Sequence, residues 1–392
     1  MRAALCLLLC GSAWAQAADY PVSKGFEYFY NLQYDDSIAE FSRQVAQHPN
    51  VPDGYNHLAQ AVLYRDMFRA GALESELVTG TNPFLRRPKV DASAEDQRRF
   101  DGAINRAMDL AQARLKQNPR DTQALYALGV SYGLRANYNF LVRKAWRDSL
   151  RDATSARKYH GRITEIDPGF IDARLVQGLH DFIVGSLPWH WRALGFLIGF
   201  RGNKDEGIRQ LELVSRKGTT NRIDAQILLC AVYRREHRPQ SAVPLLEELI
   251  RRFPHNFLFP MELAQMYSDL GYKEKALAPL RRLEQLKRSG ASGYGQLKLE
   301  KICFAEGTIQ FWYNDLDPAL ANMKKVTAAA DELDLSTGVL AWMRLGQIYD
   351  LKGQRALAID AYRRALAYAP DSDAAKESRQ YLASPYHRKQ RG

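Results

Sequence analysis

"VLAWMRLGQIYDLKGQRALAIDAYRRALAYAP", residues 339–370, is the stretch that decides the fold. Its large, small and turn-forming residues recur at the intervals expected of two helices joined by a short turn. The small residues Gly346 and Ala358 allow two antiparallel helices to approach closely, and Pro370 ends the second helix. The stretch therefore predicts a helical hairpin. Its spaced positions are Trp342, Leu345, Gly346, Tyr349, Gly353, Ala358, Tyr362, Ala365 and Pro370.

The same pattern recurs along most of the chain. Ala242 and Ala276 hold equivalent positions 34 residues apart, and looser copies raise the total to about eight helix pairs. The looser copies carry the pairs Gly25/Ser37, Ala59/Ala107, Gly129/Ala156, Gly178/Gly207 and Gly307/Ala319. This pattern resembles the tetratricopeptide repeat (TPR), and the resemblance implies an all-α TPR α-solenoid.

The chain divides into four expected segments. We expect a signal peptide over residues 1–17, degenerate repeats with insertions over 18–218, regular repeats over 219–371, and a capping helix with a frayed basic tail over 372–392. The first segment has a basic residue, a short apolar core and the small-x-small sequence Ala15-Gln16-Ala17. It predicts a cleaved signal and a periplasmic or secreted protein. Leu9 precedes Cys10 where a lipoprotein signal needs a small residue, which argues against a lipid anchor.

Charge and cysteine content limit the partners. The formal net charge is +11, which in an exported protein favours acidic protein surfaces, anionic lipid headgroups or envelope polymers over nucleic acid, unless the basic surface is merely solvated. Cys230 and Cys303 fall on first helices two repeats apart, beyond disulfide reach. We therefore expect them to act as small buried hydrophobic residues.

Motifs that resemble catalytic or metal-binding sites have structural explanations once the repeat positions are assigned. "GVSYG", residues 129–133, fits a nucleophile elbow, but Gly129 and Tyr132 are repeat positions, so Ser131 is expected to be an ordinary helical serine. The histidines lack metal-ligand spacing, and no phosphate-binding glycine loop is present in the sequence. The sequence thus predicts no catalytic residue, no metal site and no cofactor.

The concave face of the first helices is the first predicted binding site. Apolar, aromatic and methionine side chains there suit an amphipathic or extended peptide, although ordinary contacts between neighbouring repeats explain some of them. The predicted groove residues are Tyr126, Asp224, Ile227, Arg234, Arg235, Met261, Gln265, Phe304, Phe311, Trp312, Met343 and Gln347.

Three insertions form the second predicted site. The interval between the tyrosine-type and alanine-type positions is 9 residues in the regular repeats, but 45, 24 and 26 in three consecutive earlier ones. All three fall at the junction of the first and second helix, so they should emerge side by side on one edge. The resulting aromatic and basic insertion lobe comprises Phe84, Arg86, Arg87, Phe140, Arg143, Lys144, Trp146, Trp189, Trp191 and Arg192.

The third insertion contains the most apolar internal stretch, "FIVGSLPWHWRALGFLIGFRG", residues 182–202. Its central Arg192 and Pro188 oppose insertion into a bilayer, and a single crossing would place matching repeats on opposite sides of the membrane. We predict no transmembrane span. We expect a helical hairpin extension, either packed against the other insertions or partly exposed as an interfacial anchor.

A weaker, local resemblance covers residues 193–211. "ALGFLIGFRGNKDEGIRQL" resembles a segment of the outer-membrane-associated inclusion-body clearance TPR family of fungi and animals, through Gly199, Phe200, Gly202, Asn203 and Gly207. This resemblance implies a TPR interaction protein without catalytic residues.

Two functions fit these features. The first is an exported, non-catalytic scaffold that binds a protein or peptide through the groove and the insertion lobe, with peripheral contact to an anionic membrane surface as a further expectation. The alternative is a carrier or sensor of an apolar or anionic, lipid-like ligand in a pocket under the insertions.

Overall fold

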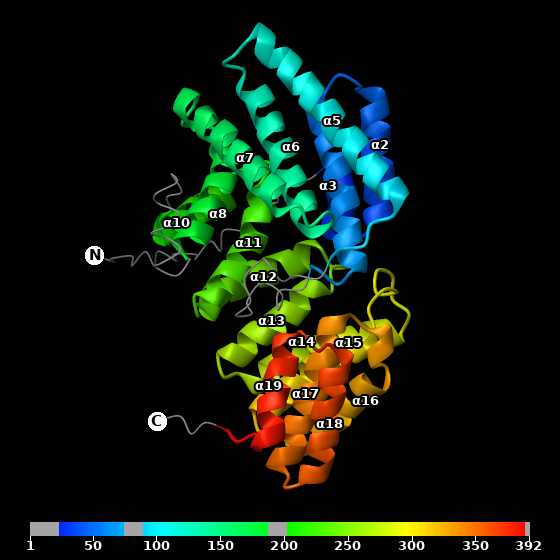
Figure 1. Cartoon of the computed structure of the whole chain (residues 1–392). Coiled ribbons are helices and arrows are strands. Elements are labelled where there is room, and N and C mark those ends of the chain that lie inside the picture. The colour runs from blue at the N-terminus through cyan, green and yellow to red at the C-terminus, as the bar shows by residue number, and fades with distance from the viewer. Residues whose placement is uncertain (1–22, 74–88, 187–201, 389–392) are drawn as a thin grey trace, which may run out of the picture.

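The computed structural model describes residues 23–73, 89–186 and 202–388, and these ranges contain seventeen α-helices and no strand (Figure 1). The helices of the N-terminal half are α1 (Lys24–Tyr30), α2 (Tyr34–Gln47), α3 (Pro52–Arg69), α5 (Ala94–Gln117), α6 (Thr122–Leu141), α7 (Trp146–Ile166), α8 (Arg174–Gly185) and α10 (Lys204–Lys217). Those of the C-terminal half are α11 (Arg222–Arg235), α12 (Pro239–Arg252), α13 (Leu258–Asp269), α14 (Lys273–Arg288), α15 (Leu299–Trp312), α16 (Leu316–Ala328), α17 (Leu335–Leu351), α18 (Arg355–Tyr368) and α19 (Asp373–Ala383).

The helices form eight antiparallel pairs followed by a capping helix. The pairs are α1/α2, α3/α5, α6/α7, α8/α10, α11/α12, α13/α14, α15/α16 and α17/α18, and the two members of each pair pack against each other. The capping helix α19 packs against α18 and α17. The predicted all-α solenoid and its repeat register are therefore confirmed.

Small residues on the first helix of a pair let the second helix approach closely. A Cβ atom placed on Gly346 would lie 2.4 Å from the ring of Tyr362, and one placed on Gly25 would lie 2.4 Å from the ring of Phe41. Both rings are completely buried. The first and the last repeat thus use the same packing device, glycine on the first helix against an aromatic ring on the second.

The two cysteines behave largely as the register predicts. Cys230 is buried, Cys303 is half-buried, and both are free thiols. The prediction that they do not pair is confirmed, but Cys303 is more accessible than the expected fully buried position.

The first pair closes the N-terminal half by contacting the fifth pair and the start of the sixth. The ring of Tyr30 lies 5.1 Å from that of Phe253, and the side chain of Asn256 donates a hydrogen bond to the Tyr30 carbonyl at 2.8 Å. In return, Asn31 accepts from the backbone N–H of His255 at 3.0 Å. We call these five residues the closure contact. Figure 1 shows its result, because the lower end of α3 lies near α12 and α13.

The described part of the insertions consists of longer helices rather than separate subdomains. The second insertion lengthens α6 to 20 residues and α7 to 21, compared with 14 for α11, with only residues 142–145 between them. The first insertion contributes α5, which has 24 residues. The expectation of a hairpin over residues 182–202 falls mainly on residues 187–201, outside the described ranges.

The described helices bear on the expectation that the chain has no membrane span. Among them, none combines the length and apolar character that a bilayer crossing requires.

Candidate functional site

The inner surface of the C-terminal half carries most of the predicted groove residues, and its accessibility falls along the chain. On α11 and α13, Ile227, Met261 and Gln265 are half-buried. On α15 and α17 the equivalent side chains are buried, with exposed fractions of 8% for Phe304, 5% for Met343 and 3% for Gln347. Of these equivalent positions, those on α11 and α13 are therefore more open to a partner than those on α15 and α17.

Two predicted arginines at the end of α11 differ in their environments. Arg234 is largely buried and pairs with Glu262 at 3.4 Å and with Asp269 at 4.0 Å, which ties α11 to α13. Arg235, the next residue, is exposed. Arg234 therefore has a structural partner, whereas Arg235 is exposed at the end of α11.

The end of α15 presents an exposed tryptophan beside an arginine. The Trp312 side chain is 54% exposed, whereas Phe311 next to it is completely buried. The guanidinium of Arg344, on α17, lies 4.3 Å from the centre of the Phe311 ring and 4.9 Å from that of Trp312. This stacking holds the two aromatic rings and the cation together.

Tyr126, on α6, and Asp224, on α11, were also predicted to line the groove. Tyr126 is buried, with its ring 5.3 Å from both Phe170 and His160. Asp224 accepts a hydrogen bond from the Tyr30 hydroxyl at 3.0 Å. Burial raises the pKa of the Asp224 carboxyl to about 6. Tyr126 is therefore an interior residue, whereas Asp224 is a half-buried partner of Tyr30, a member of the closure contact.

Residues 385–388, predicted as part of a frayed tail, are instead held against α15 and α17. The backbone N–H of Tyr386 donates to the Asp350 carboxylate at 2.8 Å. The Arg388 guanidinium donates to the carbonyls of Phe311 and Trp312, and it lies 5.1 Å from the Phe311 ring centre. This segment therefore covers Phe311 at the end of α15, while α19 packs against α17 and α18. Residues 389–392 lie outside the described part.

Asp350, Arg344 and Arg388 were not predicted as site residues. Asp350 follows the repeat position Tyr349, and its side chain is only 1% exposed. The available signal for Asp350 was an aspartate directly after the tyrosine-type repeat position, at the end of a first helix. Arg388 gave a signal in the aromatic and basic sequence "PYHR", residues 385–388, but helix periodicity ends before this sequence.

The described residues of the insertion lobe divide into buried and exposed members. Phe140 is half-buried, while Arg143 and Lys144 are exposed, and the Lys144 ammonium lies 5.6 Å from the Phe140 ring centre. Trp146 is 55% exposed. Six predicted members lie outside the described residues: Phe84, Arg86, Arg87, Trp189, Trp191 and Arg192.

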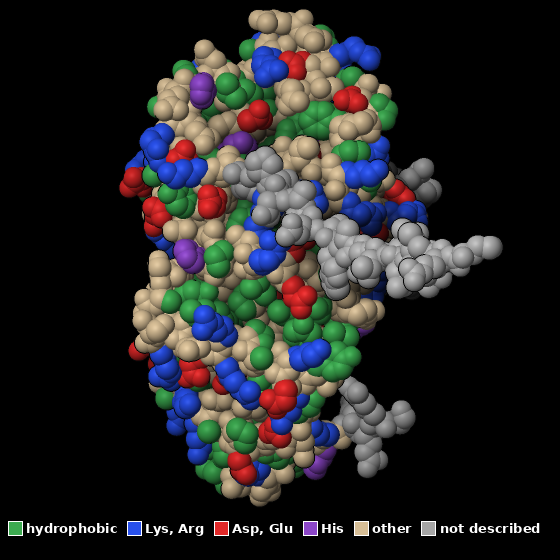
Figure 2. Space-filling view, turned by 180° about the vertical axis from the view of Figure 1, so that it is seen from behind, with side chains coloured by type: hydrophobic (Ala, Val, Ile, Leu, Met, Phe, Trp, Pro, Cys, Tyr) green, Lys and Arg blue, Asp and Glu red, His purple; other side chains and the backbone are tan. Residues whose placement is uncertain are grey.

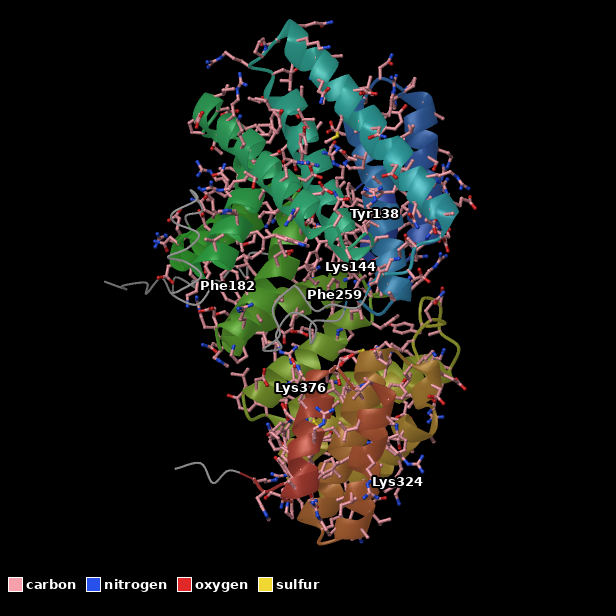
Figure 3. All side chains as sticks on the ribbon, in the orientation of Figure 1. Tyr138, Lys144, Phe182, Phe259, Lys324 and Lys376 are labelled. Carbon is pink, nitrogen blue, oxygen red and sulfur yellow. The ribbon has the colours of Figure 1, made fainter. Side chains whose placement is uncertain are left out.

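The first two insertions lie against each other, as the spacing predicts. The backbone N–H of Val90 donates to the Leu141 carbonyl at 3.0 Å, and Arg143 pairs with Asp101. Tyr138, labelled in Figure 3, stacks on Phe100 with ring centres 3.9 Å apart. The space between α5 and α6 is thus filled by side chains of the protein itself.

Much of the positive charge of the second insertion is neutralised within the fold. Arg135 makes two hydrogen bonds of 2.8 Å to the buried carboxylate of Asp152, and Arg151 pairs with Asp148 at 2.8 Å. Figure 2 shows the same pattern on the back of the molecule, where basic and acidic side chains are interspersed. A concentrated anion site formed by the described lobe residues is therefore disfavoured.

The motifs that mimic catalytic sites are structural. Ser131 is completely buried in α6, and its hydroxyl donates to Asn56 at 2.7 Å and to the Ala127 carbonyl at 2.9 Å. Within the described ranges, no group of three metal-ligating side chains is placed to hold an ion.

Comparison with known proteins places this geometry among repeat proteins. Two stretches, residues 232–291 and 339–372, match models of the tetratricopeptide repeat. A Drosophila melanogaster protein described as a BBSome complex member BBS4 homolog is 24% identical over 167 residues, which cover 43% of this chain and 31% of that protein. The chain thus spans about a third of the length of this relative.

Solved structures resemble the chain over most of its length. The crystal structure of the APC/C hetero-tetramer Cut9-Hcn1 gives a TM-score of 0.51 at 14% identity, covering 92% of this chain and 54% of that one. Yeast Tom70 gives 0.42 at 13% identity, covering 92% and 94%. At this level of identity, the first similarity supports the fold alone.

Proposed function

Because this chain is a tetratricopeptide repeat protein, we propose that it is a non-catalytic scaffold that binds a segment of a partner protein on its inner surface. Arrays of helical repeats present extended concave surfaces to partners. The observation that carries the proposal is the half-buried row of Ile227, Met261 and Gln265 on α11 and α13, together with the exposed Arg235 at the end of α11. Two apolar side chains, an amide and a cation on the same helices suit an amphipathic segment with acidic residues.

Substitution of Met261 by glutamate tests this proposal. A carboxylate in the middle of the apolar row should prevent burial of a partner side chain, because a buried unpaired charge is costly. Leu357→Glu is the matched control, since Leu357 is 50% exposed on α18, a second helix. We expect proteins captured from a cell-envelope fraction to be lost with Met261→Glu and retained with Leu357→Glu. Equal capture by two folded variants would contradict the proposal.

We further propose that the protein is exported. The support is the basic residue, apolar core and Ala15-Gln16-Ala17 sequence of residues 1–17. N-terminal sequencing of the protein isolated from its own cells should give a first residue at or near Ala18. A protein that retains Met1 would exclude cleavage.

A second contact, with an anionic membrane surface, is favoured by one face of α7. Trp146 and Leu150 are 55% and 45% exposed one turn apart, and with Arg147 they line a shallow recess of about 390 Å³ whose other arginine, Arg151, is paired with Asp148. Exposed tryptophan and leucine flanked by arginine suit the headgroup boundary of a bilayer. Purified protein should float with anionic liposomes at low salt and lose this property after Trp146→Ala. Equal flotation of both proteins would assign any binding to another surface.

A further inference from the structure

Residues 384–388 contact the ends of α15 and α17 through three separate features, each of which selects a chemical group. The first is a carboxylate that accepts a hydrogen bond from a backbone N–H. Asp350 is held by Arg355 at 2.9 Å and by the Tyr362 hydroxyl at 2.8 Å, and it accepts the Tyr386 N–H at 2.8 Å. A buried carboxylate fixed by two donors is ready to bind the N–H of an extended chain before that chain arrives.

The second feature is an aromatic position. The ring of Tyr386 lies 5.9 Å from that of Phe311 and 5.3 Å from that of Tyr381. Such ring distances are typical of favourable aromatic pairs. The position therefore prefers an aromatic side chain.

The third feature is a cation position two residues later. The Arg388 guanidinium donates to the carbonyls of Phe311 and Trp312, which are the last two residues of α15. The negative end of the helix dipole favours a cation there, and the Phe311 ring adds a cation–π contact. His387, between the two recognised side chains, is exposed.

We propose that the ends of α15 and α17 form a docking site for an extended segment with an aromatic residue followed two positions later by arginine, and that residues 384–388 occupy it as an internal competitor for such a segment of a partner. This inference rests on the proposed scaffold function and adds a second, more specific subsite to it.

The internal segment is suited to being displaced. Ser384 and Pro385 are exposed, so the connection from α19 to Tyr386 crosses solvent rather than a core. The Nε atom of Arg388 is buried without a hydrogen-bond partner among the described residues. A buried unpaired donor weakens the interaction, so a partner segment that satisfies the donor binds better. The tail nevertheless competes strongly, because a short tether gives an effective concentration on the order of millimolar.

Binding of the chain's own tail in trans tests the proposal. The probe is a fluorescein-labelled, C-terminally amidated peptide of residues 384–388, SPYHR, and the proteins are the full chain and a chain truncated after Ala383. We expect the truncated chain to bind the probe with an affinity about tenfold or more above that of the full chain, because it lacks the tethered competitor.

Two controls keep the tail experiment decisive. A probe with alanine in place of Tyr386 and Arg388 should not bind the truncated chain. The full chain carrying Tyr386→Ala and Arg388→Ala should bind the unmodified probe as well as the truncated chain does, which separates release of the site from loss of α19 packing.

Three results would overturn the inference. They are a truncated chain that keeps its helical circular dichroism but does not bind the probe, equal binding by the full and truncated chains, and a tail-dependent dimer in light scattering, which would make a second copy the occupant. None of these affects the comparison of Met261→Glu with Leu357→Glu, so failure of this inference is distinguishable from failure of the scaffold proposal.

Discussion

The two halves of the molecule cover their inner surfaces in different ways. In the N-terminal half, the first repeat reaches across to the fifth, and Tyr30, Asn31 and Asn256 are all buried at 8% exposure or less. In the C-terminal half, regular repeats end in α19, and a five-residue segment with exposed Ser384, Pro385 and His387 covers the inner surface at α15 and α17. The N-terminal cover is part of a hydrophobic core, whereas the C-terminal cover packs against the edge of a second core.

This difference distinguishes a contact that stabilises the fold, the closure contact, from one that a partner can regulate, the tail segment. Release of the closure contact exposes aromatic rings and buried amides, which costs several kcal/mol. Release of the tail segment frees Tyr386 and Arg388 and uncovers part of Phe311 and Asp350, which is fewer buried groups than the closure contact contains. The C-terminal cover is therefore the one that a partner can displace without unfolding the protein.

Phe253→Ala should have the largest effect, because it breaks the N-terminal cover. Phe253 is 2% exposed and contacts Tyr30, and truncation of a buried phenylalanine costs about 3–5 kcal/mol. Hydrogen exchange should accelerate in α1 to α3 and much less in α17 and α18. Leu357→Ala, at an exposed site, should change stability by less than about 0.5 kcal/mol. Uniform loss of protection in both halves would show that the two covers belong to one cooperative unit.

Gly346→Ala and Gly25→Ala apply the same packing change to each half. In either case the new methyl group would meet a buried aromatic ring at 2.4 Å, and overpacking of this kind costs about 1–3 kcal/mol. In Gly346→Ala the displaced ring is that of Tyr362, which holds Asp350, so exchange should also accelerate at Tyr386. In Gly25→Ala the effect should spread to residues 253–257. A tail that keeps its protection in Gly346→Ala would contradict the proposed link between Tyr362 and the tail.

The repeat register was predictable because it depends on local spacing. Gly346 and Tyr362 lie 16 residues apart, and so do Gly25 and Phe41, within one hairpin whose pattern recurs along the chain. Each copy reinforces the others, and all eight helix pairs are present in the structure. The position of Ser131 within a helix followed from the same register.

Closure of the N-terminal half was not predictable from that pattern. Asn256, in the loop between α12 and α13, binds the carbonyl of Tyr30 across 226 positions, and no helical periodicity governs such a contact. Leu32, in the loop between α1 and α2, adopts a left-handed conformation with φ of 62°, which a leucine rarely adopts and which its side chain does not signal. Arg135 and Arg143 illustrate a similar limit, because charge content predicts a basic lobe but not the carboxylates that pair with it.

The pH dependence of stability should give the next largest difference between the halves, through Asp66 in the N-terminal half. Burial and the nearby carboxylate of Asp96 raise the pKa of the Asp66 carboxyl to about 6, despite the opposing effect of Arg65 and Arg69. The unfolded chain releases this proton near pH 4, so the folded state gains stability from it at low pH and loses that stability as the pH rises through 6. Between pH 5 and pH 7, the stability of the wild type should fall by about 1 kcal/mol relative to Asp66→Asn.

The quantity to measure is the difference in the free energy of unfolding between the wild type and Asp66→Asn. Burial lowers the pKa of both His57 and His160 to about 4, so these groups reduce stability as the pH falls from about 6.5, and their contribution cancels between wild type and variant. Hydrogen exchange should localise the pH-dependent change to α3 and α5. A constant stability difference between pH 5 and pH 7 would mean that Asp66 ionises near its ordinary pKa.

The ion pair between Arg143 and Asp101 should give the smallest effect and refine the assignment of the insertions. The two side chains are 32% and 44% exposed, and a double-mutant cycle with Arg143→Gln and Asp101→Asn should give a coupling of about 0.2–1 kcal/mol that weakens with salt. A measurable coupling with unchanged liposome flotation would assign Arg143 to the architecture of the N-terminal half. No coupling, together with reduced flotation of Arg143→Gln, would assign it to a binding surface. In either case the exposed residues of α7 and the displaceable tail are two separate proposed contact sites, one on each half of the molecule.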